Sequence, residues 1–197
     1  MPLRPAFLCL LPAIAVAFAG DGIPPRGSAE EYPAHQTAGK VAIGAAYIPP
    51  VQVRKLFGED LDKHGYVVFE VGVFPIDSKQ ANVSAGDFKL MQGKDTSTVR
   101  AATPHGVAAD VWPEPPGQPW DEAGGIGGGG PRPTAGKRTV LERQLEEKSL
   151  PEVKTSKAAA GYIFFPKTSK DKRADYELLY FGLDGQISLK LSPPAKP

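Results

Sequence analysis

The chain has 197 residues, with 23 basic and 22 acidic side chains and a single cysteine. This near-neutral balance argues against partners such as nucleic acid or an anionic membrane, because both attract a clear excess of positive charge. The cysteine, Cys9, lies in an apolar N-terminal run. The rest of the chain therefore cannot form disulfides and requires an ordinary hydrophobic core.

Residues 1–19 are predicted to be a cleaved export signal. Arg4 precedes an apolar run over 6–19, and 17–19 reads Ala-Phe-Ala, the small-x-small pattern that signal peptidase recognises. This run is too short to cross a bilayer of about 30 Å as a helix. We expect cleavage between Ala19 and Gly20, no membrane span afterwards, and a periplasmic or extracellular location. Bacterial export fits a cysteine-free mature chain better than a eukaryotic secretory route.

The stretch that follows the signal is expected to be irregular up to residue 39. Residues 20–39 are rich in Gly, Pro, Ala and charge without periodicity, which predicts a flexible tether. Residues 40–48 alternate weakly and predict a first strand. Pro50 then suits the first position of a short helix, with Val53 and Phe57 on one face and Gly58 as its C-cap.

The strongest strand pattern is at 65–74, where Val67, Phe69, Val71 and Val73 form an unbroken apolar row. The charged turn before it, residues 59–63, is expected to be solvated, because the spacing of an EF-hand calcium loop is absent. Further strands are predicted around 88–90, over 96–102 with Thr98 and Arg100 outward, and over 161–166.

Residues 104–136 are predicted to be a long inserted loop, because 16 of these 33 residues are Gly or Pro. Both tryptophans, Trp112 and Trp120, lie in it. The glycine run 125–130 fits G-x-G-x-x-G formally, but no strand precedes it and prolines follow it. A dinucleotide site is therefore rejected.

The C-terminal part predicts one helix and a closing hairpin. Residues 139–150 show a capping-box pair, Thr139 with Glu142, and a narrow leucine stripe typical of a surface helix. The Asp-Gly at 184–185 favours a type I′ turn that would pair Leu183 with Gln186. Residues 192–197 are expected to be a disordered tail.

Several short strands with turns between them predict a mainly β fold, an antiparallel immunoglobulin-like β-sandwich over 40–191 with one or two short helices. The motifs at 87–90, 161–166 and 176–180 resemble those of telokin-like immunoglobulin-fold domains in exported bacterial proteins. The resemblance covers roughly residues 40–191. It implies the fold and an extracytoplasmic, non-enzymatic role, and it transfers no site residue, although the long Gly/Pro insertion departs from a compact version.

No catalytic, cofactor or metal motif is recognised in the sequence. It has no G-x-S-x-G elbow, no H-E-x-x-H helix and no P-loop, and His35, His64 and His105 are scattered. The favoured hypothesis is a structural or protein-interaction module of the cell envelope. The alternative is a carbohydrate or small-ligand domain that uses Trp112 or Trp120 as an aromatic platform, unless these rings only hold the loop to the domain. The third hypothesis is an enzyme of a type that the sequence motifs do not reveal. Arg100 is a further candidate binding residue on the outer strand face.

Overall fold

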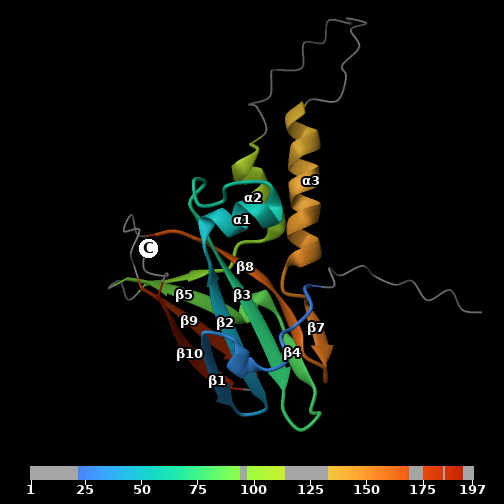
Figure 1. Ribbon diagram of the computed structural model, residues 1–197, viewed down its shortest axis with the longest axis vertical. Helices are drawn as coiled ribbons and strands as arrows, with labels where there is room; N and C mark the ends of the chain where they lie inside the picture. Colours follow the sequence, from blue (N-terminus) through green and yellow to red (C-terminus); the bar gives the residue numbers. More distant parts are fainter. Residues whose placement is uncertain (1–21, 94–96, 114–132, 169–174, 184, 193–197) are drawn as a thin grey trace, which may run out of the picture.

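The computed structural model describes residues 22–93, 97–113, 133–168, 175–183 and 185–192 (Figure 1). Two antiparallel four-stranded sheets form most of this part of the chain, so the prediction of a mainly β, antiparallel fold is confirmed. The first sheet has the order β1-β2-β3-β8, with β1 (Ala34–Ala38), β2 (Val41–Ile48), β3 (Tyr66–Pro75) and β8 (Ala159–Pro166). The second sheet has the order β10-β9-β5-β6, with β10 (Gly185–Leu191), β9 (Tyr176–Gly182), β5 (Phe88–Gln92) and β6 (Thr98–Arg100).

Helices gather at one end of the two sheets (Figure 1). They are α1 (Pro50–Phe57), α2 (Pro104–Val111) and α3 (Pro133–Lys148). Smaller elements are the β4-β7 pair (Ala81–Val83 and Val153–Thr155) and two short 3₁₀ turns, η1 (Ala29–Glu31) and η2 (Ala85–Asp87). The α1 prediction is confirmed with both of its ends: Pro50 is the first helical residue and Gly58 is a left-handed C-cap with φ 74°.

Strand β3 is buried on both faces. Its predicted apolar row, including Phe69 and Val71, is at most 3% exposed and packs against second-sheet residues such as Leu90 and Leu178. The opposite row is covered in part by the helices, because Val68 belongs to a second apolar cluster with side chains of all three helices. The sequence indicated the first core and, of the second, the α1 side with Val53 and Phe57. The α2 and α3 side chains of the second cluster come from segments further along the chain.

The prediction of a flexible tether over 20–39 is wrong for residues 22–38. This segment forms η1 and then β1, which pairs with β2. We call residues 22–32 the N-terminal strap. Ile23 bonds the edge of β8, and the Arg26 guanidinium makes two hydrogen bonds, of 3.0 and 2.9 Å, to the Glu70 carboxylate on β3. Tyr32, 2% exposed, ends the strap.

The prediction of a structureless loop over 104–136 is also wrong at both of its ends. Thr103 caps α2 by accepting from the backbone N–H of Gly106, and α3 begins at Pro133. The capping box expected at Thr139 is absent, because the Thr139 hydroxyl lies inside α3 and donates to the carbonyl of Ala135. Residues 114–132, with Trp120, lie outside the described residues, as do 1–21, with Ala19 and Gly20, and 193–197.

The β9-β10 hairpin forms with the predicted faces but in a register shifted by two. Gly182 pairs with Gly185, and Tyr180 pairs with Ile187 instead of a residue two positions further on. A shift of two keeps every side chain on its predicted face. Gly185 is needed in the ladder because its φ is 148° and a Cβ there would lie 3.0 Å from the Cβ of Ala38.

The free edge of β8 is covered by three separate segments. The backbone N–H groups of Ile23, Leu150 and Ala102 donate to the carbonyls of Ala160, Tyr162 and Phe164, at 2.9, 3.1 and 2.8 Å. Covering an edge in this way protects it from pairing with another chain. The last two of these segments also flank the groove described next.

Candidate functional site

A groove of about 730 Å³ opens beside β8, where the first sheet, the second sheet and α3 meet. One side is formed by β5, β6 and the start of α2, and the other by the end of α3 and the segment that leads to β7. Its apolar lining includes Ile163, Leu150 and Ala101. This volume lies in the usual range for small-ligand sites.

Four charged side chains line the groove, and they are divided by sign between its two sides. Lys89 on β5 and Arg100 on β6 contribute the positive charges, whereas Glu146 on α3 and Glu152 contribute the negative ones. None of the four is ion-paired with another residue that the structure describes. The lining therefore includes residues of both signs, although the Lys89 ammonium lies over the Phe181 ring on β9 and Arg100 extends away from the molecule.

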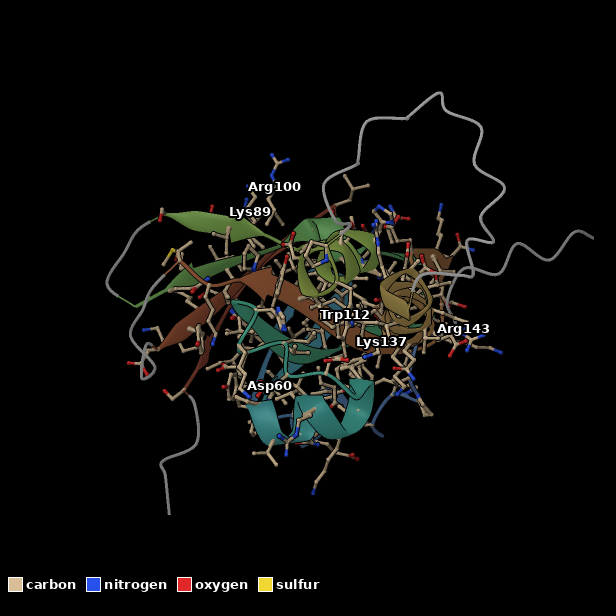
Figure 2. All side chains as sticks on the ribbon, turned by 90° about the horizontal axis from the view of Figure 1, so that it is seen from above. Asp60, Lys89, Arg100, Trp112, Lys137 and Arg143 are labelled. Carbon is tan, nitrogen blue, oxygen red and sulfur yellow. The ribbon has the colours of Figure 1, made fainter. Side chains whose placement is uncertain are left out.

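Lys89 and Arg100 are direct cross-strand partners in the β5-β6 pair. Figure 2 shows the two side chains next to each other at the margin of the molecule, with Arg100 extended away from it. Like charges placed opposite each other in this way disfavour the pairing. The Lys89 ammonium lies 5.0 Å from the centre of the Phe181 ring, which offsets part of that cost.

The outer face of the second sheet is the other surface of interest. The alternate residues that point outward on β9 and β10 include Leu179, Phe181 and Lys190, beside Lys89 on β5. Phe181 is 44% exposed. The face thus combines the exposed Phe181 ring and the half-buried Leu179 with two lysines and with Glu177, the register partner of Lys190. The alternation of inward and outward residues on β9 and β10 agrees with the prediction from sequence.

Acidic groups adjoin the groove on the Glu152 side. The Ser84 hydroxyl lies 3.3 Å from the Glu152 carboxylate, and burial together with that carboxylate raises the pKa of Asp87. Within the described ranges, no group of three or more His, Cys, Asp or Glu side chains is arranged to hold a metal ion. The groove is therefore defined by its charged and apolar lining, and the described residues give no metal site in it.

Trp112 lies at the C-terminal end of α2, away from the groove lining. It is half-buried, packs on the cluster formed by the helices, and carries the Lys137 ammonium 4.7 Å from its ring centre (Figure 2). The Trp112 ring thus packs on the domain and joins α2 to α3. The use of Trp112 or Trp120 as a ligand platform stays a prediction. Of the candidate binding residues, Arg100 is the one on the groove lining, with its side chain extended away from the molecule.

His105 is not a solitary loop residue as the sequence indicated. It lies on α2, with its Nδ1 2.7 Å from the Glu142 carboxylate and its Nε2 3.2 Å from the Arg138 guanidinium. A guanidinium can only donate, so Nε2 accepts and Nδ1 carries the proton toward Glu142. The three side chains join α2 to α3.

Asp62 in the predicted solvated turn is likewise engaged, since it forms an ion pair with Lys167 just after β8. This contact holds the turn before β3 against the end of a neighbouring strand. Among the described helices, none is long and apolar enough to cross a membrane.

The groove was missed by sequence reasoning because no local motif encodes it. Its lining comes from residues 85–104, 146–152 and 162–164, which meet only after both sheets have formed. The signal that was available is Lys89 and Arg100, two basic side chains in predicted strands that follow each other in the chain. These two residues predict positive charge on the strands and do not predict a pocket.

No family model matches the chain, and no curated protein matches it. Among solved structures, the chain is similar to the crystal structure of "a putative lipoprotein (ycdA)" from Bacillus subtilis, with a TM-score of 0.43 and 16% sequence identity. The similarity covers 82% of this chain and 39% of the other, so this chain spans about two fifths of that protein's length. A likeness at this level carries no argument about function.

Proposed function

We propose that this protein is an exported, non-enzymatic interaction module of the bacterial cell envelope, built on an immunoglobulin-like arrangement of two sheets of the telokin-like kind. The export signal expected over 1–19 supports the location. The absence of catalytic motifs in the sequence supports a binding role. The partner class is an envelope protein.

One observation carries the proposal: the outer face of the second sheet places the exposed Phe181 ring and the half-buried Leu179 beside lysine side chains that form no ion pair with a residue the structure describes. Leu179 and Phe181 on β9 lie beside Lys89 on β5, and Lys190 lies on the neighbouring strand β10. Aromatic side chains are enriched at the centre of protein interfaces, and charged side chains such as these lysines belong to the polar rim. The face favours a partner with an acidic rim around an apolar patch.

The test is capture from an envelope extract by the purified mature chain, with two variants compared. Phe181→Ser combined with Lys190→Glu changes the proposed face, whereas Val51→Ser removes an apolar side chain that is 64% exposed on α1. We expect the first variant to lose a specific captured protein and the second to retain it. Equal capture by both variants would show that this face is not the interface.

The small-ligand alternative is favoured by a separate observation, the groove of about 730 Å³ beside β8. Its carbohydrate form relies on Trp112 and Trp120, and the Lys137 ammonium lies over the Trp112 ring. Binding of a panel of neutral oligosaccharides to the wild type and to Trp112→Ala tests that form. Unaltered melting of this variant together with lost binding would support it.

A further inference from the structure

The N-terminal strap lies outside both apolar cores. It crosses the first sheet from the edge of β8, where Ile23 is bonded, to β2 and β3, where Tyr32 is buried (Figure 1). Ala29 and Tyr32 are its buried residues, and neither belongs to the cluster between the sheets or to the cluster formed by the helices. The buried members of both cores therefore come from the rest of the chain.

Three separate contacts hold the strap on the sheet. At its start, the backbone N–H of Ile23 donates to a carbonyl of β8 at 2.9 Å. In its middle, the Arg26 guanidinium donates two hydrogen bonds, of 3.0 and 2.9 Å, to the Glu70 carboxylate. At its end, the Tyr32 ring packs on β2 and β3. A backbone bond at a strand edge, a bidentate ion pair and a buried ring are also the contacts by which a separate peptide binds a sheet.

Glu70 is the only charged residue of β3, the strand that is buried on both faces. Its side chain is 13% exposed, and its ion-pair partner is Arg26. A carboxylate with so little contact with water is costly without a cation beside it. Displacement of the strap therefore leaves a negative charge in an apolar surface. A guanidinium fits this position best, because it can donate two parallel hydrogen bonds.

A slot for an aromatic ring lies on the same face of β3 as this carboxylate. Gly44 on β2 and Gly72 on β3 are register partners, and a Cβ on either would lie 2.4 or 2.6 Å from the Tyr32 side chain. Phe74 forms one wall, because its ring meets that of Tyr32 edge-on with the centres 6.0 Å apart. The slot therefore fits a flat ring at a fixed position from the carboxylate.

The strap keeps part of its shape through contacts within itself. The Arg26 guanidinium donates to the carbonyl of Glu31 at 2.8 Å, and the backbone N–H of Gly27 donates to the Glu31 carboxylate at 3.1 Å. Two prolines precede the arginine, and proline favours an extended backbone. These features do not depend on the sheet. A segment of another chain with the same pattern can therefore present its arginine and its ring in the same way.

We propose that this face of the first sheet binds an extended segment of a partner protein, in which an arginine is followed six residues later by an aromatic residue. The strap is the built-in competitor for this site, because Arg26 and Tyr32 have this spacing. A competitor joined to its site by a short tether acts at a millimolar effective concentration. The site therefore accepts a partner segment only when that segment outcompetes the strap or when the strap is released. This inference goes beyond the proposed function, since it uses the first sheet and not the outer face of the second.

The probe is a fluorescently labelled synthetic peptide with the sequence of residues 22–32, titrated into the full mature chain. The apparent affinity depends on the fraction of chains in which the strap has left the site. We expect weak saturable binding to the wild type and binding that is tighter by about tenfold to Arg26→Ala, because this substitution weakens the strap and leaves the site intact. The same peptide with alanine in place of its arginine or its tyrosine should lose this gain.

Two further variants separate the site from the strap. Glu70→Gln, added to Arg26→Ala, removes the carboxylate that the peptide needs and should abolish the gain in affinity. Arg143→Ala is the matched control, because it removes an arginine that is 70% exposed on α3 and pairs with Glu147. This control should bind the peptide as weakly as the wild type does, and equal tightening in it would contradict the inference. Melting curves report the folding of each variant.

Hydrogen exchange in the wild type tests release of the strap without any substitution. The N–H of Tyr32 donates to the carbonyl of Ala29 within the strap, whereas Val71 lies in the centre of the first sheet. Segments that open locally exchange faster than segments that open only on global unfolding. We expect the Tyr32 amide to exchange on the order of a hundredfold faster than the Val71 amide.

Four results would overturn the inference: no saturable peptide binding to Arg26→Ala at millimolar concentration, equal binding of the alanine-substituted peptides, equal protection of the Tyr32 and Val71 amides, or loss of folding in Arg26→Ala. The last two would show that the strap opens only together with the domain. None of these results bears on the outer face of the second sheet, where capture by the Phe181→Ser, Lys190→Glu variant is the readout. The two proposals can therefore fail independently.

Discussion

Tyr32 shows how one side chain fixes the N-terminal strap to the first sheet. Its ring lies against Gly44 and Gly72, which are register partners on β2 and β3. The Arg26 guanidinium lies over the opposite side, 4.3 Å from the ring centre, and binds Glu70 at the same time. The ring thus fills a slot that exists because two facing residues lack side chains.

Gly44→Ala is expected to lower the free energy of unfolding by about 1–3 kcal/mol, because the new Cβ would lie 2.4 Å from Tyr32 Cδ2 and force the ring out. Chemical denaturation measures the loss. In a Tyr32→Ala background the same substitution should cost much less, since the clash is absent. Additive losses in the double variant would show that the ring does not occupy the slot.

Tyr66 provides a pH-dependent contact between β3 and α2. Its hydroxyl donates to the Asp110 carboxylate at 2.5 Å, and burial followed by this hydrogen bond raises the pKa of Tyr66 to about 12. The ordinary value is near 10, so the unfolded chain loses this proton first as the pH rises. The contribution of Tyr66 is complete below pH 10 and is lost between about pH 10 and 12.

Tyr66→Phe should therefore show a shallower fall in stability over this pH window than the wild type, although it is less stable at neutral pH. Urea unfolding at pH 8 and pH 11 gives the comparison. Burial also raises the pKa of Tyr32, Tyr47 and Tyr162, and these tyrosines contribute a common fall in both proteins. An identical fall in the two proteins would contradict the assignment to Tyr66.

At the scale of elements, α3 packs on the other two helices through a narrow apolar side. Leu141 and Leu145 are 2% and 0% exposed in the cluster formed by the helices, and Lys148 donates to the carbonyl of Leu56 on α1. Most of the remaining surface of the helix carries charge or is exposed. The prediction from sequence of a surface helix with a narrow leucine stripe matches this arrangement.

Leu145→Ala is expected to destabilise the protein by about 2–5 kcal/mol, because it leaves a cavity at a fully buried position. Val140→Ala on the same helix is the control, since Val140 is 48% exposed and should cost well under 1 kcal/mol. Thermal or urea unfolding separates the two. Comparable losses would show that α3 does not pack through its leucine side.

The elements that sequence patterns predicted are those with a strong local signal. Strand β3 has an unbroken apolar row, and α1 has Pro50 and Gly58 at its ends. Strand β1 was missed because Ala-His-Gln-Thr-Ala has little apolar alternation and three of its five residues are exposed. Its strand conformation comes from pairing with β2, which is information from elsewhere in the chain.

Helix α2 was missed for a different reason. Thr103 as the N-cap, Pro104 at the first position and the apolar Val107 and Val111 are a local helix signal. The high average content of Gly and Pro over 104–136 concealed it. The groove had no such signal. Arg100 was predicted as a candidate binding residue on the outer strand face, and the acidic lining residues Glu146 and Glu152 lie in a distant segment.

At the scale of the whole molecule, the expected export signal and the folded domain are close neighbours in the chain. Predicted cleavage before Gly20 leaves three residues ahead of Ile23, the first strap residue bonded to β8. Intact-mass analysis of protein produced in an exporting bacterial host should give a mature chain that starts at Gly20. A retained residue 1 would contradict both the cleavage site and the proposed location.

The bond between Ile23 and Ala160 also has a consequence for the order of events during export. The strap is at the front of the chain, whereas β8, which receives it, is made near the end. A chain that crosses a membrane N-terminus first cannot close this contact until nearly all of it has emerged. Non-local pairing of this kind forms slowly in any case. If the expected signal directs export in this way, the strap over 22–32 would close onto β8 only after residue 160 has emerged, as one of the last steps of folding.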